Sequence, residues 1–261
     1  MYLNSIKGKK ILLVGSIGIL GKIFAEEIVR HGGDLIIADM NIQKLEKLAK
    51  KLSVKYFYID LEKEKTVIDC VKKSAKYLGG IDVVISNAAI TGDIIKKIAP
   101  KKAYAPFSDQ SLKLWKKTID VNLTGSFLLA RESEQHLSKA KGSFIITSSI
   151  YGIVGPDQRI YKETKMGCRA SYSASKAGLV GLTKWLATYW GERGIRVNCV
   201  VPGGIKSNQD PEFIQNYSNR VPLGRMANPS DIVGIFLYLI SDHSAYTTGG
   251  VHVVDGGLSV W

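Results

Sequence analysis

A tyrosine and a lysine lie four residues apart in the segment Ser171–Leu179, written SYSASKAGL. On an α-helix, Tyr172 and Lys176 share one face and are separated by one turn. Their neighbours are serine, alanine and glycine, so this face stays open to a large flat ligand. A phenol with a pKa of about 10 is a poor base at neutral pH, whereas a nearby ammonium favours the phenolate. The pair therefore predicts a general acid/base that moves a proton to or from an oxygen.

A glycine-rich turn follows the first apolar run of the chain, as GSIGILG over residues 15–21. Glycines between a strand and a helix allow a tight bend and a close approach of backbone to a pyrophosphate, which the N–H groups and dipole of the helix N-terminus attract. The spacing differs from G-x-G-x-x-G, so a turn without a ligand is the alternative. The predicted cofactor contacts here are Gly15, Gly18, Ile19, Leu20 and Gly21.

A carboxylate at the end of the second predicted strand indicates which dinucleotide binds. Asp39 lies 18 residues after Gly21, close to the spacing of a carboxylate that hydrogen-bonds the ribose hydroxyls of the adenosine. It would repel a 2′-phosphate, and Met40 offers no compensating charge. We therefore expect NAD(H) to be preferred over NADP(H), although Lys44 and Lys47 could reach a phosphate.

A second carboxylate, Asp60, ends the third predicted strand and is followed by Leu61. It could accept a hydrogen bond from the adenine amino group. It could equally cap the helix that is expected from Glu62 onward. Both interpretations remain open on the sequence, with Asp60 and Leu61 as candidate cofactor contacts.

Apolar runs of strand length alternate with longer stretches of helical period. We expect strands at 10–14, 34–39, 55–59, 81–86, 143–148, 195–201 and 251–255, and helices at 18–31, 43–51, 62–77, 111–139, 172–191 and 229–241. Nearly continuous Val, Ile and Leu predict a parallel sheet that is buried on both faces. The pattern indicates a doubly wound α/β (Rossmann) fold with ligands at the carboxyl ends of the strands. We expect one domain over 1–261, with a dinucleotide-binding half to about 125 and a catalytic half after it.

These residues, together with Asn87-Ala-Ala, Asn122 and Ser149, resemble the short-chain dehydrogenase/reductase family as an ordered set over nearly the whole chain. The resemblance implies that Tyr172 is the general acid/base and that Lys176 lowers its pKa and holds the nicotinamide ribose. It implies that Ser149 stabilises the substrate oxygen and that Asn122 supports a proton-relay water.

The same resemblance implies further contacts. Cofactor contacts fall on Asn87, Ala88, Pro202, Gly203, Ile205 and Ser207, in addition to the catalytic pair. The segment 248–257, TGGVHVVDGG, is similar to the family's last strand, which commonly packs against another subunit. It implies a homo-oligomer, either a dimer or a tetramer.

Two segments are longer than in typical members of the family. The insertion 155–170 carries Arg159, Lys162, Lys165 and Arg169, and the segment 91–110 carries Lys96, Lys97, Lys101 and Lys102. Long loops at the carboxyl end of a sheet often hold substrate or act as lids. Their basic character indicates a polar or anionic small-molecule substrate. A solvated insertion or a subunit contact is the alternative.

Segments 151–157 and 222–226, with the insertion, are similar to a narrower group, the flagellin-modification-type oxidoreductases of surface-sugar pathways. We therefore expect an oxidoreductase that interconverts a secondary alcohol and a ketone on a sugar, sugar phosphate or nucleotide sugar. A 3-oxoacyl carrier or coenzyme A reductase is the second enzymatic interpretation. A dinucleotide-sensing binding protein is the non-enzymatic one.

Charge and cysteine usage exclude other classes. The net charge is +13, but lysines come in small groups expected on exposed helix faces, without interleaved aromatics, so we expect no nucleic-acid site. The three cysteines and four histidines lack disulfide or metal spacing, which predicts a reducing, cytoplasmic setting and no metal. No signal peptide or membrane-spanning run is recognised.

Overall fold

The computed structural model describes residues 6–100, 103–164 and 166–261, and its centre is a seven-stranded parallel sheet. The strand order is β3-β2-β1-β4-β5-β6-β7, so the order reverses between β1 and β4. The strands are β1 (Lys10–Val14), β2 (Asp34–Asp39), β3 (Lys55–Tyr58), β4 (Val83–Ser86), β5 (Ser143–Thr147), β6 (Arg196–Pro202) and β7 (Val251–Val254). The doubly wound α/β fold predicted from the apolar runs is confirmed.

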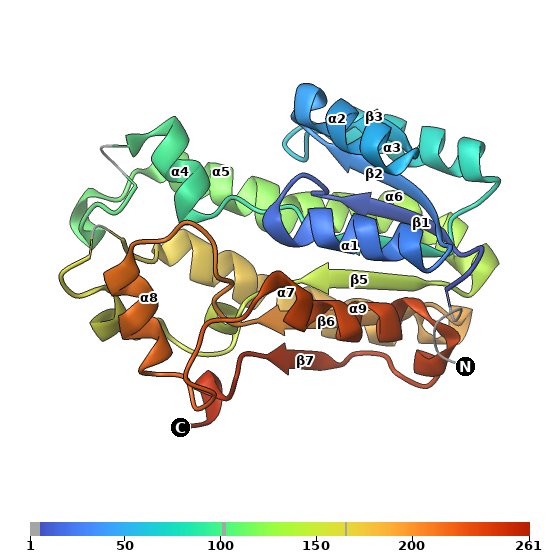
Figure 1. The fold of residues 1–261 in the computed structure, drawn as a ribbon. Coiled ribbons are helices and arrows are strands. Elements are labelled where there is room, and N and C mark those ends of the chain that lie inside the picture. Colours follow the sequence, from blue (N-terminus) through green and yellow to red (C-terminus); the bar gives the residue numbers. More distant parts are fainter. Residues whose placement is uncertain (1–5, 101–102, 165) are drawn as a thin grey trace.

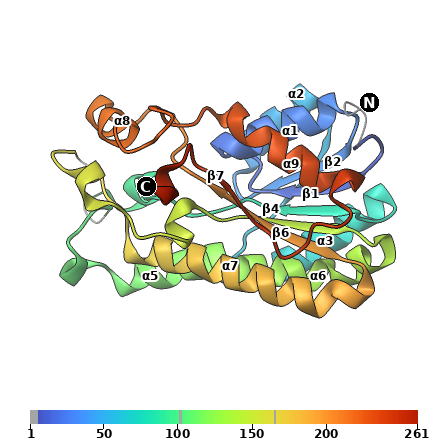
Figure 2. The same ribbon diagram turned by 90° about the horizontal axis from the view of Figure 1, so that it is seen from below.

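Helices cover both faces of the sheet and give three layers (Figure 1, Figure 2). One layer contains α1 (Ile19–Arg30), α2 (Ile42–Leu52) and α9 (Val233–Ile240). The other contains α3 (Glu64–Leu78), α5 (Leu112–Ile119), α6 (Gly125–Ala140) and α7 (Ala170–Trp190). The strands point toward the end of the molecule where α4 (Gly92–Ile98) and α8 (Pro211–Ser218) lie (Figure 1).

Two apolar cores lie on the two faces of the sheet, because successive strand side chains point to opposite faces. Leu12 and Val14 face the core under α3, α6 and α7, which is closed by Trp190. Ile11 and Leu13 face the core under α1, α2 and α9. Since the side chains of both cores are almost completely buried, the sheet is a rigid base for the side chains at its carboxyl edge.

The segment between β4 and β5 differs from the single helix expected over 111–139. It contains α5, a π-helical turn at Asp120–Thr124, and α6. The sequence analysis also missed α4 and α8, which are short. Both lie at the carboxyl end of the sheet, where they border the pocket described below.

Candidate active site

Tyr172 and Ser149 meet at the carboxyl edge of the sheet. Tyr172 lies in the first turn of α7, and Ser149 follows β5 by two residues. The two side chains lie close enough for the Ser149 hydroxyl to lower the pKa of Tyr172. Ser149 caps the 3-10 turn Ile150–Gly152 by accepting from the N–H of Tyr151 at 3.3 Å. The hydroxyl predicted to bind the reacting oxygen is thus fixed beside the predicted acid/base.

Lys176 lies one helical turn after Tyr172, and its Nζ is 5.7 Å from the centroid of the Tyr172 ring. The side chain is buried, and Nζ donates to the carbonyl oxygen of Thr147 at 2.7 Å. The helix is held to the same strand end, because Ser148 Oγ donates to the carbonyl of Lys176 at 2.7 Å. The spacing of four residues therefore places phenol and ammonium together, as the sequence predicts.

Burial dominates the titration of both groups. It raises the pKa of Tyr172 to about 12, against the hydrogen bond from Ser149, which lowers it, while Cys168 raises it further. Burial also lowers the pKa of Lys176 to about 8. In the protein alone, the pKa of Tyr172 is therefore higher than usual, whereas the sequence analysis expected a neighbouring ammonium to lower it. Burial in a low-dielectric site disfavours the phenolate of Tyr172 and the ammonium of Lys176. This cost exceeds the attraction between the two charges.

Asn122 lies in the π-helical turn and is fully buried. Its Oδ1 accepts from the N–H of Ile90 at 2.7 Å, and its Nδ2 donates to the Ile90 carbonyl at 3.3 Å and to Ser175 Oγ at 3.0 Å. Ser175 Oγ in turn donates to the carbonyl of Tyr172 at 2.8 Å. Asn122 therefore connects the end of β4 to the turn of α7 that carries Tyr172.

The glycine turn after β1 has the geometry of a dinucleotide cradle. Gly15 has φ +84°, and a Cβ there would lie 2.4 Å from the N atom of Ala88. A Cβ on Gly21 would lie 2.1 Å from the Gly15 carbonyl oxygen. Packing thus requires glycine at both positions.

The third glycine of the turn, Gly18, is exposed. A Cβ on it would meet no atom closer than 3.7 Å, so the chain's own packing does not require glycine there. Gly18 is the N-cap of α1, which has no side-chain cap and no acidic residue in its first turn. Exposed N–H groups beside a glycine fit a pyrophosphate. Ile19, about half exposed, and Leu20 begin this helix.

Asp39 ends β2 next to this cradle. Its carboxylate accepts from the N–H groups of Met40 at 2.7 Å, Ile17 at 3.3 Å and Asn41 at 3.4 Å. Burial raises its pKa, although these three hydrogen bonds and the charge of Lys44 lower it. The Met40 side chain is exposed. The carboxylate is thus held at the end of β2 beside the glycine turn, and its contact with an adenosine ribose stays a prediction.

Asp60 and Leu61 have structural partners. The Asp60 carboxylate accepts from the N–H of Glu62 at 3.1 Å and pairs with Lys63 Nζ at 3.1 Å. Asp60 therefore stabilises the turn before α3, a role similar to the helix cap that the sequence analysis gave as the alternative. The side chain of Leu61 is buried against Gly125. Of the two readings of Asp60, this geometry shows only the structural one directly.

The remaining predicted cofactor residues follow β4 and β6. Asn87 Nδ2 donates to the Gly15 carbonyl at 2.9 Å, so it fixes the glycine turn, and Ala88 packs against Gly15. After Pro202, the N–H of Gly203 donates to the Val254 carbonyl at 2.9 Å. We call residues 202–205 the cofactor turn.

The cofactor turn leads into a short hydrogen-bonded loop. Gln209 closes this loop, since its Nε2 donates to the Ile205 carbonyl at 2.8 Å and its Oε1 accepts from the Ser207 N–H at 2.6 Å. The structure therefore places the predicted catalytic and cofactor residues along one edge of the sheet.

A pocket of about 120 Å³ opens beside Tyr172. Aromatic and apolar side chains make most of its wall, and its charged lining residue is Arg169. Its sides come from the segment after β4, the insertion, α7 and α8. The lining includes Ile90, Ile95, Tyr104, Tyr151, Tyr161, Met166, Cys168, Arg169, Tyr172 and Phe213.

The structure describes the side chains of three basic residues of the two long segments, and of these only Arg169 lines the pocket. Arg159 is mostly exposed and donates to both carboxylate oxygens of Asp157 at 2.9 and 3.0 Å. Lys162 is also exposed, and only Arg169 is buried beside the pocket. Lys101, Lys102 and Lys165, and the side chains of Lys96 and Lys97, lie outside the described residues.

The aromatic wall was missed by sequence reasoning. Tyr161 Oη donates to Tyr151 Oη at 2.7 Å, and the Tyr161 and Phe213 rings are 5.6 Å apart. Tyr151 could have been identified because it lies two residues after Ser149. Tyr161 and Phe213 carry no local signal, since only packing of the insertion against α8 brings them to the site.

Two other kinds of site were sought. In the part of the chain that the structure describes, no three His, Cys, Asp or Glu side chains gather as a metal site. Among the same residues, no helix has the length and apolar character needed to span a membrane.

Known proteins match the chain over nearly its full length. Residues 16–259 match the family model described as Enoyl-(Acyl carrier protein) reductase. The chain is 30% identical to the 3-oxoacyl-(acyl-carrier-protein) reductase FabG of Aquifex aeolicus, over 97% of this chain and 98% of that protein. It is 28% identical to 2,5-dichloro-2,5-cyclohexadiene-1,4-diol dehydrogenase of Sphingobium indicum, over 98% and 99% of the two chains.

Solved structures agree with the fold. A short-chain dehydrogenase from Leptospira borgpetersenii with bound NAD+ superposes with a TM-score of 0.86 at 30% identity, over 100% of this chain and 96% of that one. A short-chain type dehydrogenase/reductase from Mycobacterium marinum gives 0.85 at 27% identity, over 99% and 98%. Together with the glycine turn and the cluster of Tyr172, Lys176 and Ser149, these matches show that the chain belongs to the short-chain dehydrogenase/reductase family of oxidoreductases, which act on CH–OH groups with a nicotinamide dinucleotide.

Proposed function

We propose that this oxidoreductase interconverts a secondary alcohol and a ketone with Tyr172 as the general acid/base. The observation that carries the proposal is that Tyr172, which lines the pocket, lies close enough to Ser149 for this hydroxyl to lower its pKa, on the same sheet edge as the glycine turn. A dinucleotide held at the glycine turn and Asp39 would supply the nicotinamide as acceptor or donor of the hydride.

The chain's own residues handle the oxygen and its proton. In oxidation, Tyr172 Oη takes the hydroxyl proton as the C–H bond is lost, and in reduction it gives the proton back. Ser149 Oγ donates to the reacting oxygen and holds it at the phenol. Lys176 supplies positive charge beside the phenol, and Asn122 fixes the helix turn that carries it.

Replacement of the phenol tests this assignment. Tyr172→Phe keeps the ring but removes the proton carrier, so kcat falls by roughly 10²–10⁴-fold. The affinity for NADH, measured by fluorescence titration, stays within about twofold because the cradle is untouched. Tyr238→Phe, which removes a phenol on the outer helix α9, is the matched control. Full activity of the Tyr172→Phe enzyme would remove tyrosine from the mechanism.

We propose NAD(H) as the preferred cofactor, on the position of Asp39. Its carboxylate is fixed by three backbone N–H groups, so it is aimed at the adenosine ribose and its negative charge repels a 2′-phosphate. Lys44 lies close enough to lower its pKa. We propose that Lys44 does not offset the repulsion between Asp39 and a 2′-phosphate, because Asp39 itself stands at the end of β2 where the ribose is expected.

We propose a polyhydroxylated ring as the substrate, of the class of a sugar, sugar phosphate or nucleotide sugar. The C–H faces of such a ring pack on the aromatic wall, while its hydroxyls pair with the phenols of Tyr151 and Tyr161. The buried guanidinium of Arg169 provides the positive charge at the pocket that favours an anionic substituent. The FabG relative supports a second candidate, a 3-oxoacyl thioester.

A substrate panel separates these candidates. Sugar phosphates, nucleotide sugars, alicyclic diols and a 3-oxoacyl thioester are assayed with NAD(H) and with NADP(H), read as absorbance of the reduced cofactor. The expected result is turnover of a ring alcohol, with kcat/KM at least about tenfold higher with NAD(H), which corresponds to about 1.4 kcal/mol. Turnover of the thioester alone would replace the ring proposal. NADH binding without any turnover would favour a sensing protein.

A further inference from the structure

We propose that Tyr217 is a positioning residue for the cofactor: its hydroxyl holds the N–H of Gly204 and thereby sets the cofactor turn, residues 202–205, against the nicotinamide end of the dinucleotide. The inference rests on the proposed function, because it takes NAD(H) as the cofactor, and on the expectation from the family resemblance that residues 202–205 contact it. It adds a residue on α8 that the motif residues of the sequence did not indicate.

The contact between Tyr217 and the turn is close. The N–H of Gly204 donates to Tyr217 Oη at 2.5 Å. A Cβ on Gly204 would lie 2.6 Å from Tyr217 Cζ, and one on Gly203 would lie 3.3 Å from its Oη. The ring therefore packs directly on both glycines, and only residues without a side chain fit beneath it.

The turn is held from two sides. On the sheet side, the N–H of Gly203 donates to the Val254 carbonyl on β7 at 2.9 Å. On the other side, Tyr217 satisfies Gly204. Burial raises the pKa of Tyr217 to about 12, against the Gly204 hydrogen bond, which lowers it. The phenol is therefore neutral at physiological pH and can serve as a steady acceptor.

Tyr217 also packs against residues that border the pocket beside Tyr172. It shares a buried cluster with Phe213, one turn earlier on α8, and with Ile160 of the insertion. The Phe213 and Tyr217 rings are 5.9 Å apart, and Phe213 lines the pocket. The insertion is tied to the segment that follows α8 by the ion pair of Arg220 and Asp157 at 3.0 Å. The same helix thus shapes the pocket through Phe213 and the cofactor turn through Tyr217.

A comparison of two ligands tests the inference by equilibrium titration. NADH reaches the nicotinamide end of the site, whereas ADP-ribose lacks that ring. Tyr217→Phe keeps the packing but leaves the Gly204 N–H without an acceptor, so the turn must be ordered when the ligand binds. The affinity for NADH falls by about fivefold or more, and the affinity for ADP-ribose is unchanged. Gly204→Ala, whose Cβ would push against the Tyr217 ring, gives the same selective loss.

Two further variants make every outcome decisive. Gly203→Ala displaces the turn, since its Cβ would lie 2.9 Å from Asp255 Cα, and it tests whether the turn contacts the cofactor at all. Tyr238→Phe is the control for loss of a phenol elsewhere. If Gly203→Ala weakens NADH binding while Tyr217→Phe does not, the role of Tyr217 is overturned and the cofactor contact stands. If neither weakens it, both proposals fail. Equal loss of ADP-ribose in Tyr217→Phe would show general damage and overturn the selective role.

Discussion

At the scale of single residues, the site buries two titratable groups, Tyr172 and Lys176, and burial disfavours the charged form of each. Lys176 is almost entirely buried and finds a carbonyl oxygen as its partner. Burial pushes its pKa down to about 8 and that of Tyr172 up to about 12. An ammonium held in a dry site costs stability, and this cost is of the kind expected where function requires a charge.

Removing that charge should stabilise the protein in a pH-dependent way. Because the folded pKa of Lys176 lies below its ordinary value of 10.5, the unfolded chain binds more protons between about pH 8 and 10.5, and wild-type stability rises with pH there. Lys176→Met therefore unfolds at a higher urea concentration at about pH 7, with a gain on the order of 1–3 kcal/mol, while activity is lost.

The gain of Lys176→Met should shrink by about pH 9.5, where the folded wild-type lysine is largely neutral. Unfolding of both proteins at the two pH values measures the difference. Exposed Lys184 on the same helix, changed to Met, is the control and should show no such pH dependence. A constant difference between Lys176→Met and wild type across this range would contradict the buried charge.

At the scale of elements, the π-helical turn between α5 and α6 orients Asn122. Its i→i+5 hydrogen bond, from Gly125 N–H to the Asp120 carbonyl, interrupts an otherwise continuous helix. The interruption turns Asn122 toward the end of β4 and the start of α7, where it bonds Ile90 and Ser175. Such single π turns occur often at functional sites.

Asn122→Ala should therefore affect both stability and turnover. The buried N–H of Ile90 loses its acceptor, which costs about 1–3 kcal/mol. The first turn of α7 loses its tie through Ser175, so kcat falls while the KM for cofactor changes little. Thermal denaturation and steady-state kinetics check this. Ser133→Ala is the control, since Ser133 Oγ is buried on α6 without a hydrogen-bond partner among the described residues. Wild-type kcat in Asn122→Ala would remove the positioning role.

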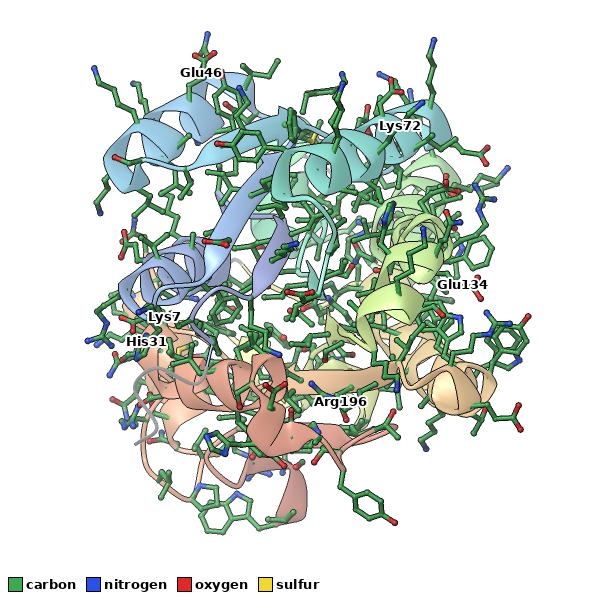
Figure 3. All side chains as sticks on the ribbon, turned by 90° about the vertical axis from the view of Figure 1, so that its right-hand side faces the viewer. Lys7, His31, Glu46, Lys72, Glu134 and Arg196 are labelled. Carbon is green, nitrogen blue, oxygen red and sulfur yellow. The ribbon has the colours of Figure 1, made fainter. Side chains whose placement is uncertain are left out.

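At the scale of the whole molecule, positive charge and exposed aromatics lie on the outer surface. Lys72 on α3 projects from its helix (Figure 3), consistent with the lysine groups expected on exposed faces. On α7, the rings of Trp185 and Tyr189 stack at 4.7 Å although both are more than half exposed. An aromatic patch of this kind marks a surface that another protein can cover.

We propose that the chain forms a homo-oligomer and that this patch belongs to its interface. Trp185→Glu places a charge in the patch, so the protein sediments as a smaller species than wild type in analytical ultracentrifugation. Tyr77→Glu, at an exposed tyrosine on α3, is the matched control and leaves the sedimentation unchanged. A wild-type monomer would contradict the oligomer, and an unchanged Trp185→Glu assembly would exclude the patch from its interface.

Local features of the sequence were enough to predict the sheet and to place the candidate catalytic residues at one edge of it. The nearly continuous apolar runs, the glycines at 15 and 21, and the i, i+4 spacing of Tyr172 and Lys176 each extend over only a few residues. In a parallel sheet, the carboxyl ends of neighbouring strands meet at one edge. Knowing that Asp39 and Ser149 follow strands therefore places them on one side of the molecule.

Packing between distant segments decided the rest. The aromatic pocket combines Tyr104, Tyr161 and Phe213, which lie far apart in the chain. The helix α8 is too short to have a long periodic pattern from which it could be predicted. The pKa of Tyr172 is raised because the folded chain excludes water from it, a property of the whole surroundings. Sequence spacing determines which groups can meet. Tertiary structure alone determines how deeply they are buried, because burial sums contributions from every element around the site.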